Sequence, residues 1–233
     1  MKKKFTLLCV FFSIGTLFAQ KKSGTVIYDV AQLHFDYKGT NIDVINMRKM
    51  AKKQQYNLTF NEHYSSFKLK EMLRDENFDE SANSSAHTYI AFYDYYFDYK
   101  APIILEDAGG GYLIEQKLDT IPWVITSETK DIGDYQCYKA TYTFDFINGR
   151  NKTVTRTITA WFAPSLPYSH GPKNYRGLPG LILELSDQNV TFLASSIQLF
   201  EKPIEVKIPA VKRISDEEYT KQLFKNYGDI LKK

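Results

Sequence analysis

The feature that most constrains this chain is a long series of short segments in which apolar and polar residues alternate. Between residues 24 and 200, about ten such segments follow one another, most of them joined by short connections. Alternation is the pattern of a half-buried strand, short connections pair neighbouring strands antiparallel, and a sheet of this many strands must twist and curl. The sequence therefore predicts a mainly β fold with minor α. We expect a strongly curved antiparallel sheet or a half-open β-barrel, with one or two helices packed against its concave side.

The expected elements follow from these patterns and from the turn signals between them. A glycine-rich connection at 107–111 predicts a hairpin, and the polar segment 74–86 predicts an exposed loop. Residues 42–55 have the spacing of a short amphipathic helix. Ser215 and Glu218 form a capping box, which predicts a C-terminal helix. The ranges predicted as strands are 24–35, 56–60, 65–69, 88–100, 103–106, 112–118, 122–128, 135–146, 153–162, 181–185 and 191–200.

Residues 1–19 have the three parts of a secretory signal peptide. Three lysines precede an apolar run that ends at the small residue Ala19, so we expect export to the periplasm or the extracellular space, with cleavage after Ala19. The run is shorter than the ~20 apolar residues of a membrane span, and we expect no transmembrane segment in the mature chain. The rest of the chain is interpreted as a β-rich domain at 20–203 and a C-terminal extension with a helix at 204–233.

Charge and cysteine content exclude further classes. Without the three lysines of the leader, the 30 basic residues fall to 27, which equals the 27 acidic ones. A neutral chain is not expected to bind nucleic acid. The mature chain keeps one cysteine, Cys137, so its fold has no internal disulfide. The strand pattern around Cys137 predicts a buried thiol instead of a nucleophile.

No arrangement of residues indicates catalysis or a cofactor. The four histidines lack the spacing of zinc ligands, and the chain has no Gly-x-Ser-x-Gly turn around a nucleophile. The glycines of 107–111 are not followed by the lysine and the helix of a phosphate-binding loop. We therefore predict no catalytic residue, no bound metal and no cofactor.

The densest aromatic segment of the chain, residues 89–99, suggests a binding surface. If it is a strand, Tyr93, Tyr95 and Phe97 share one face. Tyrosine suits the wall of a cleft because its ring is apolar and its hydroxyl tolerates water. We expect these three residues, together with Trp161, to line a cleft between the curved sheet and a helix. The alternative is that they fill the core.

The segment 160–185 has the most distinctive local sequence. Leu178 precedes Pro179 and must be extended, and Pro179-Gly180 suits the centre of a type II turn, where Gly180 supplies a positive φ. Arg176 is expected to be exposed. The simplest interpretation is a corner of the sheet that requires special backbone angles.

The same residues carry a resemblance. Gly177, Leu178, Pro179, Gly180, Leu181 and Ile182 resemble the signature of the GLPGLI family of exported bacterial proteins. Trp123, the segments 132–140 and 160–164, and Gly171-Pro172 agree with that pattern. The resemblance covers roughly residues 24 to 200. It implies export and a structural role for the six motif residues, and it implies no activity and no catalytic residue.

We expect an exported cell-envelope protein that binds a hydrophobic small molecule, a peptide or an outer-membrane protein without catalysis. The alternatives are a periplasmic hydrolase with an unrecognised site and a structural or assembly subunit. Polar residues gathered in a cleft favour the hydrolase, an apolar cleft favours the binder, and a flat surface favours the subunit.

Overall fold

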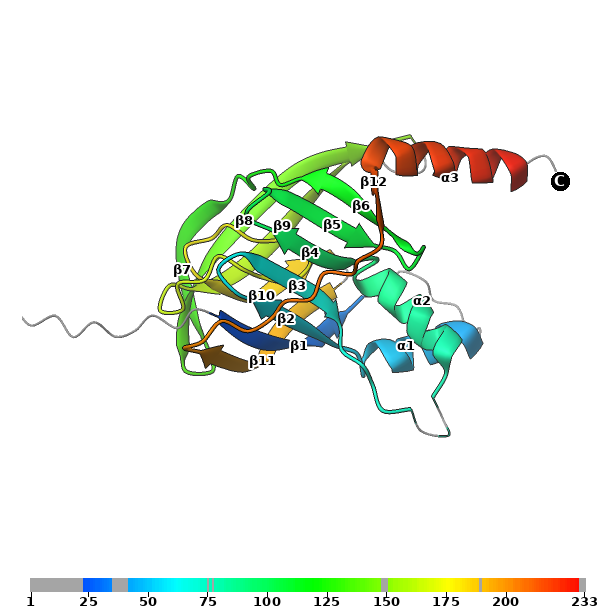
Figure 1. Ribbon diagram of the computed structural model, residues 1–233. Helices are drawn as coiled ribbons and strands as arrows, with labels where there is room; N and C mark the ends of the chain where they lie inside the picture. Colours follow the sequence, from blue (N-terminus) through cyan, green and yellow to red (C-terminus); the bar gives the residue numbers. More distant parts are fainter. Residues whose placement is uncertain are drawn as a thin grey trace, which may run out of the picture.

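The computed structural model describes residues 23–34, 42–74, 76, 78–147, 151–188 and 190–230, the last five by their backbone alone. The predicted leader at 1–19 lies outside the described residues. Figure 1 shows the arrangement of twelve strands and three helices. The elements are β1 (Ser23–Leu33), α1 (Ile42–Ala51), β2 (Gln55–Phe60), β3 (Tyr64–Leu69), α2 (Glu80–Ile90), β4 (Asp94–Asp98), β5 (Ile103–Asp107), β6 (Tyr112–Lys117), β7 (Val124–Ile132), β8 (Tyr135–Ile147), β9 (Thr153–Ala163), β10 (Leu181–Asp187), β11 (Val190–Phe200), β12 (Lys212–Ser215) and α3 (Asp216–Ile230).

The strands form one strongly curved sheet that is open, with β12 and β7 at its two edges. Its order is β12-β6-β5-β4-β3-β2-β1-β11-β10-β9-β8-β7. The strands from β2 to β6 and from β7 to β11 pair as successive antiparallel neighbours. Most of them are joined by short connections, whereas α2 lies between β3 and β4 and a long loop lies between β9 and β10. β1 joins the two halves by pairing with β2 on one side and β11 on the other. The predicted fold class is confirmed.

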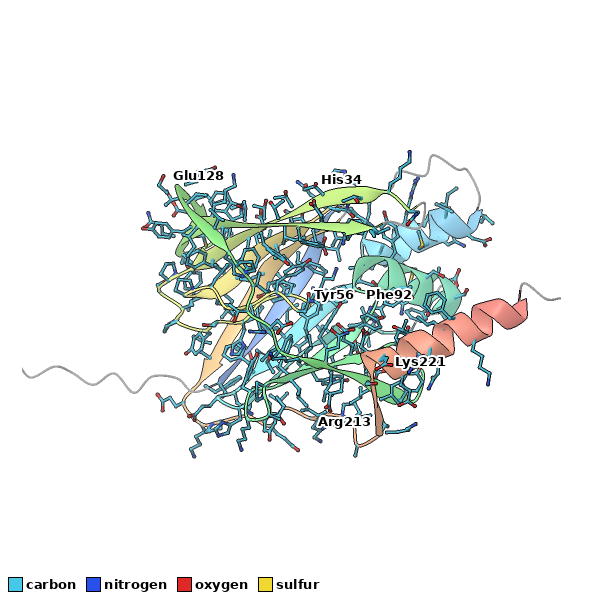
Figure 2. All side chains as sticks on the ribbon, turned by 90° about the horizontal axis from the view of Figure 1, so that it is seen from above. His34, Tyr56, Phe92, Glu128, Arg213 and Lys221 are labelled. Atoms are coloured by element: carbon cyan, nitrogen blue, oxygen red, sulfur yellow. The ribbon has the colours of Figure 1, made fainter. Side chains whose placement is uncertain are left out.

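The concave side of the sheet is filled by aromatic side chains. The ring of Tyr56 stacks on Phe67 at 5.2 Å between centroids and meets the edge of Phe192 at 5.4 Å. Figure 2 shows Tyr56 in the interior of the molecule. These residues come from β2, β3 and β11, so the curvature of the sheet brings distant strands into one core. The largest fully buried side chains of the protein include Tyr28, Tyr56, Phe60, Phe67, Phe162 and Phe192.

Helices α1 and α2 pack against each other at one end of this core (Figure 1). Met50 and Ala51 are the buried residues of α1, and Ala82, Ala86 and Ile90, spaced four residues apart, are those of α2. That spacing places the three α2 residues on one face of the helix.

The segment 74–90 corrects two predictions. Residues Glu80–Ile90 form α2, which replaces the later part of the exposed loop expected at 74–86 and the start of the strand expected at 88–100; of that strand only Asp94–Asp98 is present, as β4. The Asp79 carboxylate accepts a hydrogen bond from the Ala82 amide at 2.9 Å and caps the helix. Burial of the apolar face of α2 outweighs the low helix propensity of its serines and asparagine.

The chain after β11 returns across the opposite face of the sheet as an extended strap, residues 201–211 (Figure 1). Ile204 fixes its start: the Ile204 amide donates to the Ser23 hydroxyl at 3.2 Å, and the Ile204 carbonyl accepts from the Asn61 amide group at 2.9 Å. Ile208 then packs against a second buried cluster, formed by Tyr96, Leu105 and Leu113. The strap therefore covers the outer face of β4, β5 and β6.

The strap leads into β12, which pairs in parallel with β6, and into α3, which extends away from the sheet in both views (Figures 1 and 2). The Glu218 amide donates to the Ser215 hydroxyl at 3.1 Å, so Ser215 caps α3 as predicted, while the Glu218 carboxylate accepts from Lys212 and Gln222. Among the described residues, no helix combines the length and the apolar character that crossing a bilayer requires.

Candidate functional site

The aromatic residues expected to line a cleft lie in two parts of the sheet. Tyr95 and Phe97 are 5% and 3% exposed and belong to the main core, while Tyr93 is half-buried, with its ring against the rings of Phe92 and Tyr95. Trp161 lies on β9, where the Lys130 ammonium stands 4.4 Å from the centre of its ring. Tyr95 and Phe97 therefore fill the core, the alternative that the sequence left open. The pockets described below are lined by other residues.

A different pocket lies at the rim of the sheet, between the turn that joins β2 to β3 and the loop of residues 164–180, which we call the motif loop. The pocket has a volume of about 370 Å³. We call it the rim pocket. Its lining combines aromatic rings with polar side chains. The lining residues are Phe60, Asn61, Glu62, Tyr99, Pro167, Tyr168, Ser169, His170, Arg176 and Gly177.

His170 anchors one wall of the rim pocket. Its ring packs on Phe60 at 4.6 Å between centroids, and its Nδ1 is 3.0 Å from the hydroxyl of Tyr99. The same hydroxyl is 2.7 Å from Oγ of Ser65, which completes a chain of three polar side chains. Burial, aided by the Arg176 guanidinium, lowers the pKa of His170 to about 4, and burial raises the pKa of Tyr99 to about 12. Both groups are uncharged at neutral pH.

Arg176 brings a charge to the rim pocket. Its guanidinium donates to the Asp119 carbonyl and lies 5.9 Å from the centre of the Phe97 ring. Its side chain also lines a second pocket of about 190 Å³ beside Asp119, so it stands between the two. Burial lowers the pKa of Arg176 below its usual value, although an arginine remains protonated at neutral pH. The sequence predicted an exposed side chain at this position, whereas the structure shows a half-buried one.

The backbone around Arg176 is held on both sides. The Trp123 indole N–H donates to the Arg176 carbonyl at 2.8 Å, and the Gly177 amide donates to the Ser169 carbonyl at 3.1 Å. Gly177 has φ +89°, a conformation that favours glycine, and it lets the chain turn between Arg176 and the buried Leu178.

The end of the motif is anchored in the core. Leu181 and Ile182 are fully buried, and the Tyr28 hydroxyl, reaching across the concave side, donates to the Ile182 carbonyl at 2.6 Å. Gly180 is required for a different reason from the expected type II turn. A Cβ at Gly180 would lie 2.3 Å from the Ala163 carbonyl oxygen, so the close approach of two backbone segments excludes a side chain.

The rim pocket is suited to binding. Ser65, the hydroxyl connected to His170 through Tyr99, is 1% exposed, so a substrate carbonyl has no access to it. The described ranges also contain no group of three or more His, Cys, Asp or Glu side chains that could hold a metal ion. The accessible part of the lining combines the half-buried rings of Tyr99 and Tyr168 with a neutral histidine, a half-buried guanidinium and the exposed side chains of Glu62 and Ser169. Such a mixture of apolar surface and a few polar groups is typical of ligand sites.

Sequence reasoning missed this site because its members come from separate segments. Tyr99 and His170 are 71 positions apart along the chain. The available signal was Arg176 itself, a cation inside an otherwise apolar and glycine-rich motif.

A further hollow, distinct from the rim pocket and from the pocket beside Asp119, lies beside α1 and has a volume of about 410 Å³. It is lined by Met50, Lys53, Gln55, Lys70, Glu71, Met72, Leu73 and Phe78. Leu73 is 96% exposed, so this hollow is bordered by a side chain with little support from the fold. We consider the rim pocket the stronger candidate because hydrogen bonds fix its walls.

Comparisons with known proteins show a similar fold and a family match that includes the motif loop. The profile of a family described as "Protein of unknown function (Porph_ging)" matches residues 146–184, which include the motif loop. A comparison with curated protein sequences finds no match. Two structures of PNGF-II are similar, with TM-scores of 0.54 and 0.53 and identities of 14% and 15% over 88% of this chain. LprF from Mycobacterium bovis aligns with a TM-score of 0.28 and 12% identity, over 82% of this chain and 90% of LprF.

This chain spans about a third of the length of PNGF-II, because the alignments cover 33% of that protein. At these identities the PNGF-II likeness concerns the fold alone. The family match covers less than half of this chain, and the chain is therefore similar to a family of unknown function in the region that contributes the motif loop to the rim pocket.

Proposed function

We propose that this is an exported cell-envelope protein that binds its ligand in the rim pocket without catalysis. The proposal includes cleavage of the leader after Ala19, a β-rich unit at 20–203 followed by the extension at 204–233, and membership of the GLPGLI family. Export is supported by the sequence of residues 1–19, and membership by the motif at 177–182.

The observation that carries the binding role is the construction of the rim pocket. Its cation, Arg176, is placed by a motif whose two flanks are tied to Ser169 and to the core, and its histidine is held by stacking and by a hydrogen bond. Preorganised walls reduce the cost of ordering side chains when a ligand binds. Burial of Ser65 supports binding over the hydrolase alternative, since the hydroxyl linked to His170 through Tyr99 is inaccessible. The exposed Ser169 hydroxyl also lines the pocket, but the described contacts show no hydrogen bond from it to His170, whose Nδ1 faces Tyr99.

Native mass spectrometry of the protein purified from its own host tests the proposal, because a bound ligand or partner adds a defined mass. Ser169 is exposed and lines the rim pocket, so Ser169→Trp fills the pocket without disturbing the core. Ser165 is exposed on the same loop and is not among the lining residues, which makes Ser165→Trp the matched control.

We expect the wild-type protein and Ser165→Trp to carry an added mass that Ser169→Trp lacks. A wild-type protein with no added mass, or a Ser169→Trp protein that keeps it, overturns the binding role of this pocket. Conversion of the bound species to a hydrolysis product by the purified protein overturns the non-enzymatic part and favours the hydrolase.

A further inference from the structure

Arg176 differs from other arginines of this protein in its partners. Arg74, Arg156 and Arg213 form ion pairs with Glu80, Asp187 and Glu115, at 3.3, 3.7 and 3.3 Å respectively. Within the described ranges, Arg176 has no carboxylate within ion-pair distance, and its acceptor is the neutral Asp119 carbonyl. Its Nε–H is buried with no acceptor, a feature that it shares with the ion-paired Arg156. The Asp119 carboxylate acts on Arg176 only from beyond ion-pair distance, and it is exposed and pairs with Lys117. A half-buried charge without a direct ion pair is costly, and such groups occur mainly at functional sites.

The position of Arg176 is set by its surroundings. The Trp123 indole N–H binds its carbonyl, the Ser169 carbonyl accepts from the following amide, and the Phe97 ring lies beside the guanidinium. These contacts keep the cation at the junction of the rim pocket and the pocket beside Asp119. A guanidinium placed in this way has donors left for a ligand, since the described contacts use few of its five N–H groups.

The charges around the two pockets indicate what kind of anion fits. The rim pocket holds the acidic Glu62 and a histidine that stays neutral, and the second pocket holds Lys117 and Asp119, which lie 4.0 Å apart and are more than 80% exposed. Arg176 is thus opposed by no other half-buried charge and joined by no second half-buried cation. A single guanidinium matches a singly charged, planar carboxylate better than a doubly charged phosphate, which recruits several cations.

The rest of the rim pocket indicates what the carboxylate is attached to. The half-buried Tyr99 and Tyr168 present aromatic surface, and the buried Phe60 ring supports that of Tyr168 at 5.0 Å between centroids. A volume of about 370 Å³ accommodates one aromatic or branched group next to the carboxylate.

Building on the proposed binding function, we propose that the rim pocket recognises a carboxylate attached to an apolar or aromatic group, with Arg176 as the anion-binding residue. This chemistry is present in free apolar acids and in the C-terminal residue of a peptide that ends in an apolar side chain.

NMR titration of the isotope-labelled protein tests this recognition, with 3-phenylpropionate and its uncharged amide as one pair of ligands. The tripeptide Gly-Gly-Phe, with a free or an amidated C-terminus, forms the second pair. The amides of Ser169 and Gly177 report occupation of the rim pocket, and the Nε–Hε resonance of Arg176 reports contact with the anion. The variants are Arg176→Gln, Arg176→Lys and, as a matched control on an ion-paired arginine, Arg213→Gln (Figure 2).

We expect at least one acid to bind the wild type about tenfold or more tightly than its amide, because a charge-assisted hydrogen bond is lost in the amide. The preference should disappear in Arg176→Gln, weaken in Arg176→Lys and persist in Arg213→Gln. The amides should bind Arg176→Gln as they bind the wild type, which shows that the variant is folded. Preference for phenylpropionate identifies free acids as the source of the carboxylate, and preference for the tripeptide identifies a peptide C-terminus.

Equal binding of acid and amide at the rim pocket overturns the inference while leaving the binding function intact. An acid preference that survives in Arg176→Gln overturns it as well, as does the absence of pocket shifts with all four ligands. The binding function itself is then decided by the added mass in native mass spectrometry.

Discussion

Replacement of Gly180 by alanine tests the role of the motif in the fold. The new Cβ would lie 2.3 Å from the carbonyl oxygen of Ala163, 2.7 Å from its carbonyl carbon and 3.0 Å from the nitrogen of Pro164. Ordinary contact begins at 3.4 Å, so one of the two backbone segments must move by about 1 Å. Neither the segment at Ala163 nor the segment at Gly180 can move freely, because Ala163 pairs with Leu181, the residue after Gly180, in the β9–β10 ladder.

The magnitude follows from the contacts that such a shift disturbs. Overpacking of this kind costs about 1–3 kcal/mol, and weakening one hydrogen bond at the end of the ladder adds about 1 kcal/mol. We therefore expect Gly180→Ala to lower the free energy of unfolding by about 3 kcal/mol. For a chain of this length, that corresponds to a fall in Tm of roughly 6–12 °C.

Gly177→Ala is the matched control, because Gly177 belongs to the same motif and has φ +89° but no atom within 4 Å of the position of a Cβ. It should cost about 1–2 kcal/mol through backbone strain alone. Urea unfolding followed by the fluorescence of Trp123 and Trp161 measures both variants. A Gly180→Ala protein no less stable than Gly177→Ala would refute the steric argument.

Three further predictions concern single residues. Cys137 is fully buried, and burial raises the pKa of its thiol to about 11, so a thiol reagent should label the native protein far more slowly than the urea-unfolded chain; equal rates would contradict its burial. Burial, with a smaller effect of Asp216, raises the pKa of Glu106 from 4.5 to about 7. The folded state therefore binds the proton of the Glu106 carboxyl group more tightly than the unfolded chain does, and the free energy of unfolding falls as pH rises from 4.5 to about 7. Glu106→Gln should remove that fall and stabilise the protein at pH 8 by roughly 2–3 kcal/mol, and an unchanged pH profile of urea unfolding argues against this role. N-terminal sequencing of the exported protein should begin at Gln20; retention of Met1 or a lipid on Cys9 would show that the leader was misinterpreted.

The helix α2 shows how a local pattern was overlooked. Ala82, Ala86 and Ile90 recur every fourth residue and Asp79 precedes them as a cap, which together are signals of a helix. The polar residues between them favoured a loop instead. Docking against α1 and the core decided the outcome, because burial of the apolar face stabilises a helix that is marginal alone.

The aromatic residues of β4 show a different limit. Alternation correctly places Tyr95 and Phe97 on one face of the strand, and both are buried. Alternation does not say whether a face meets a cavity or other side chains, since that depends on the volume supplied by strands far away in the sequence. The face of Tyr96 is buried as well, under the strap, which no pattern within β4 indicates.

The sequence alone determined what depends on neighbouring residues: most of the strands and their antiparallel succession, the helix cap at Ser215 and the strand around Cys137. Tertiary structure decided what depends on distant residues. The place of β1 between β2 and β11, the chain from Ser65 through Tyr99 to His170, and the half-buried Arg176 all arise when curvature of the sheet brings separate segments together. Backbone preferences and side-chain periodicity are local properties, whereas a pocket is formed by surfaces that meet only after the chain has folded.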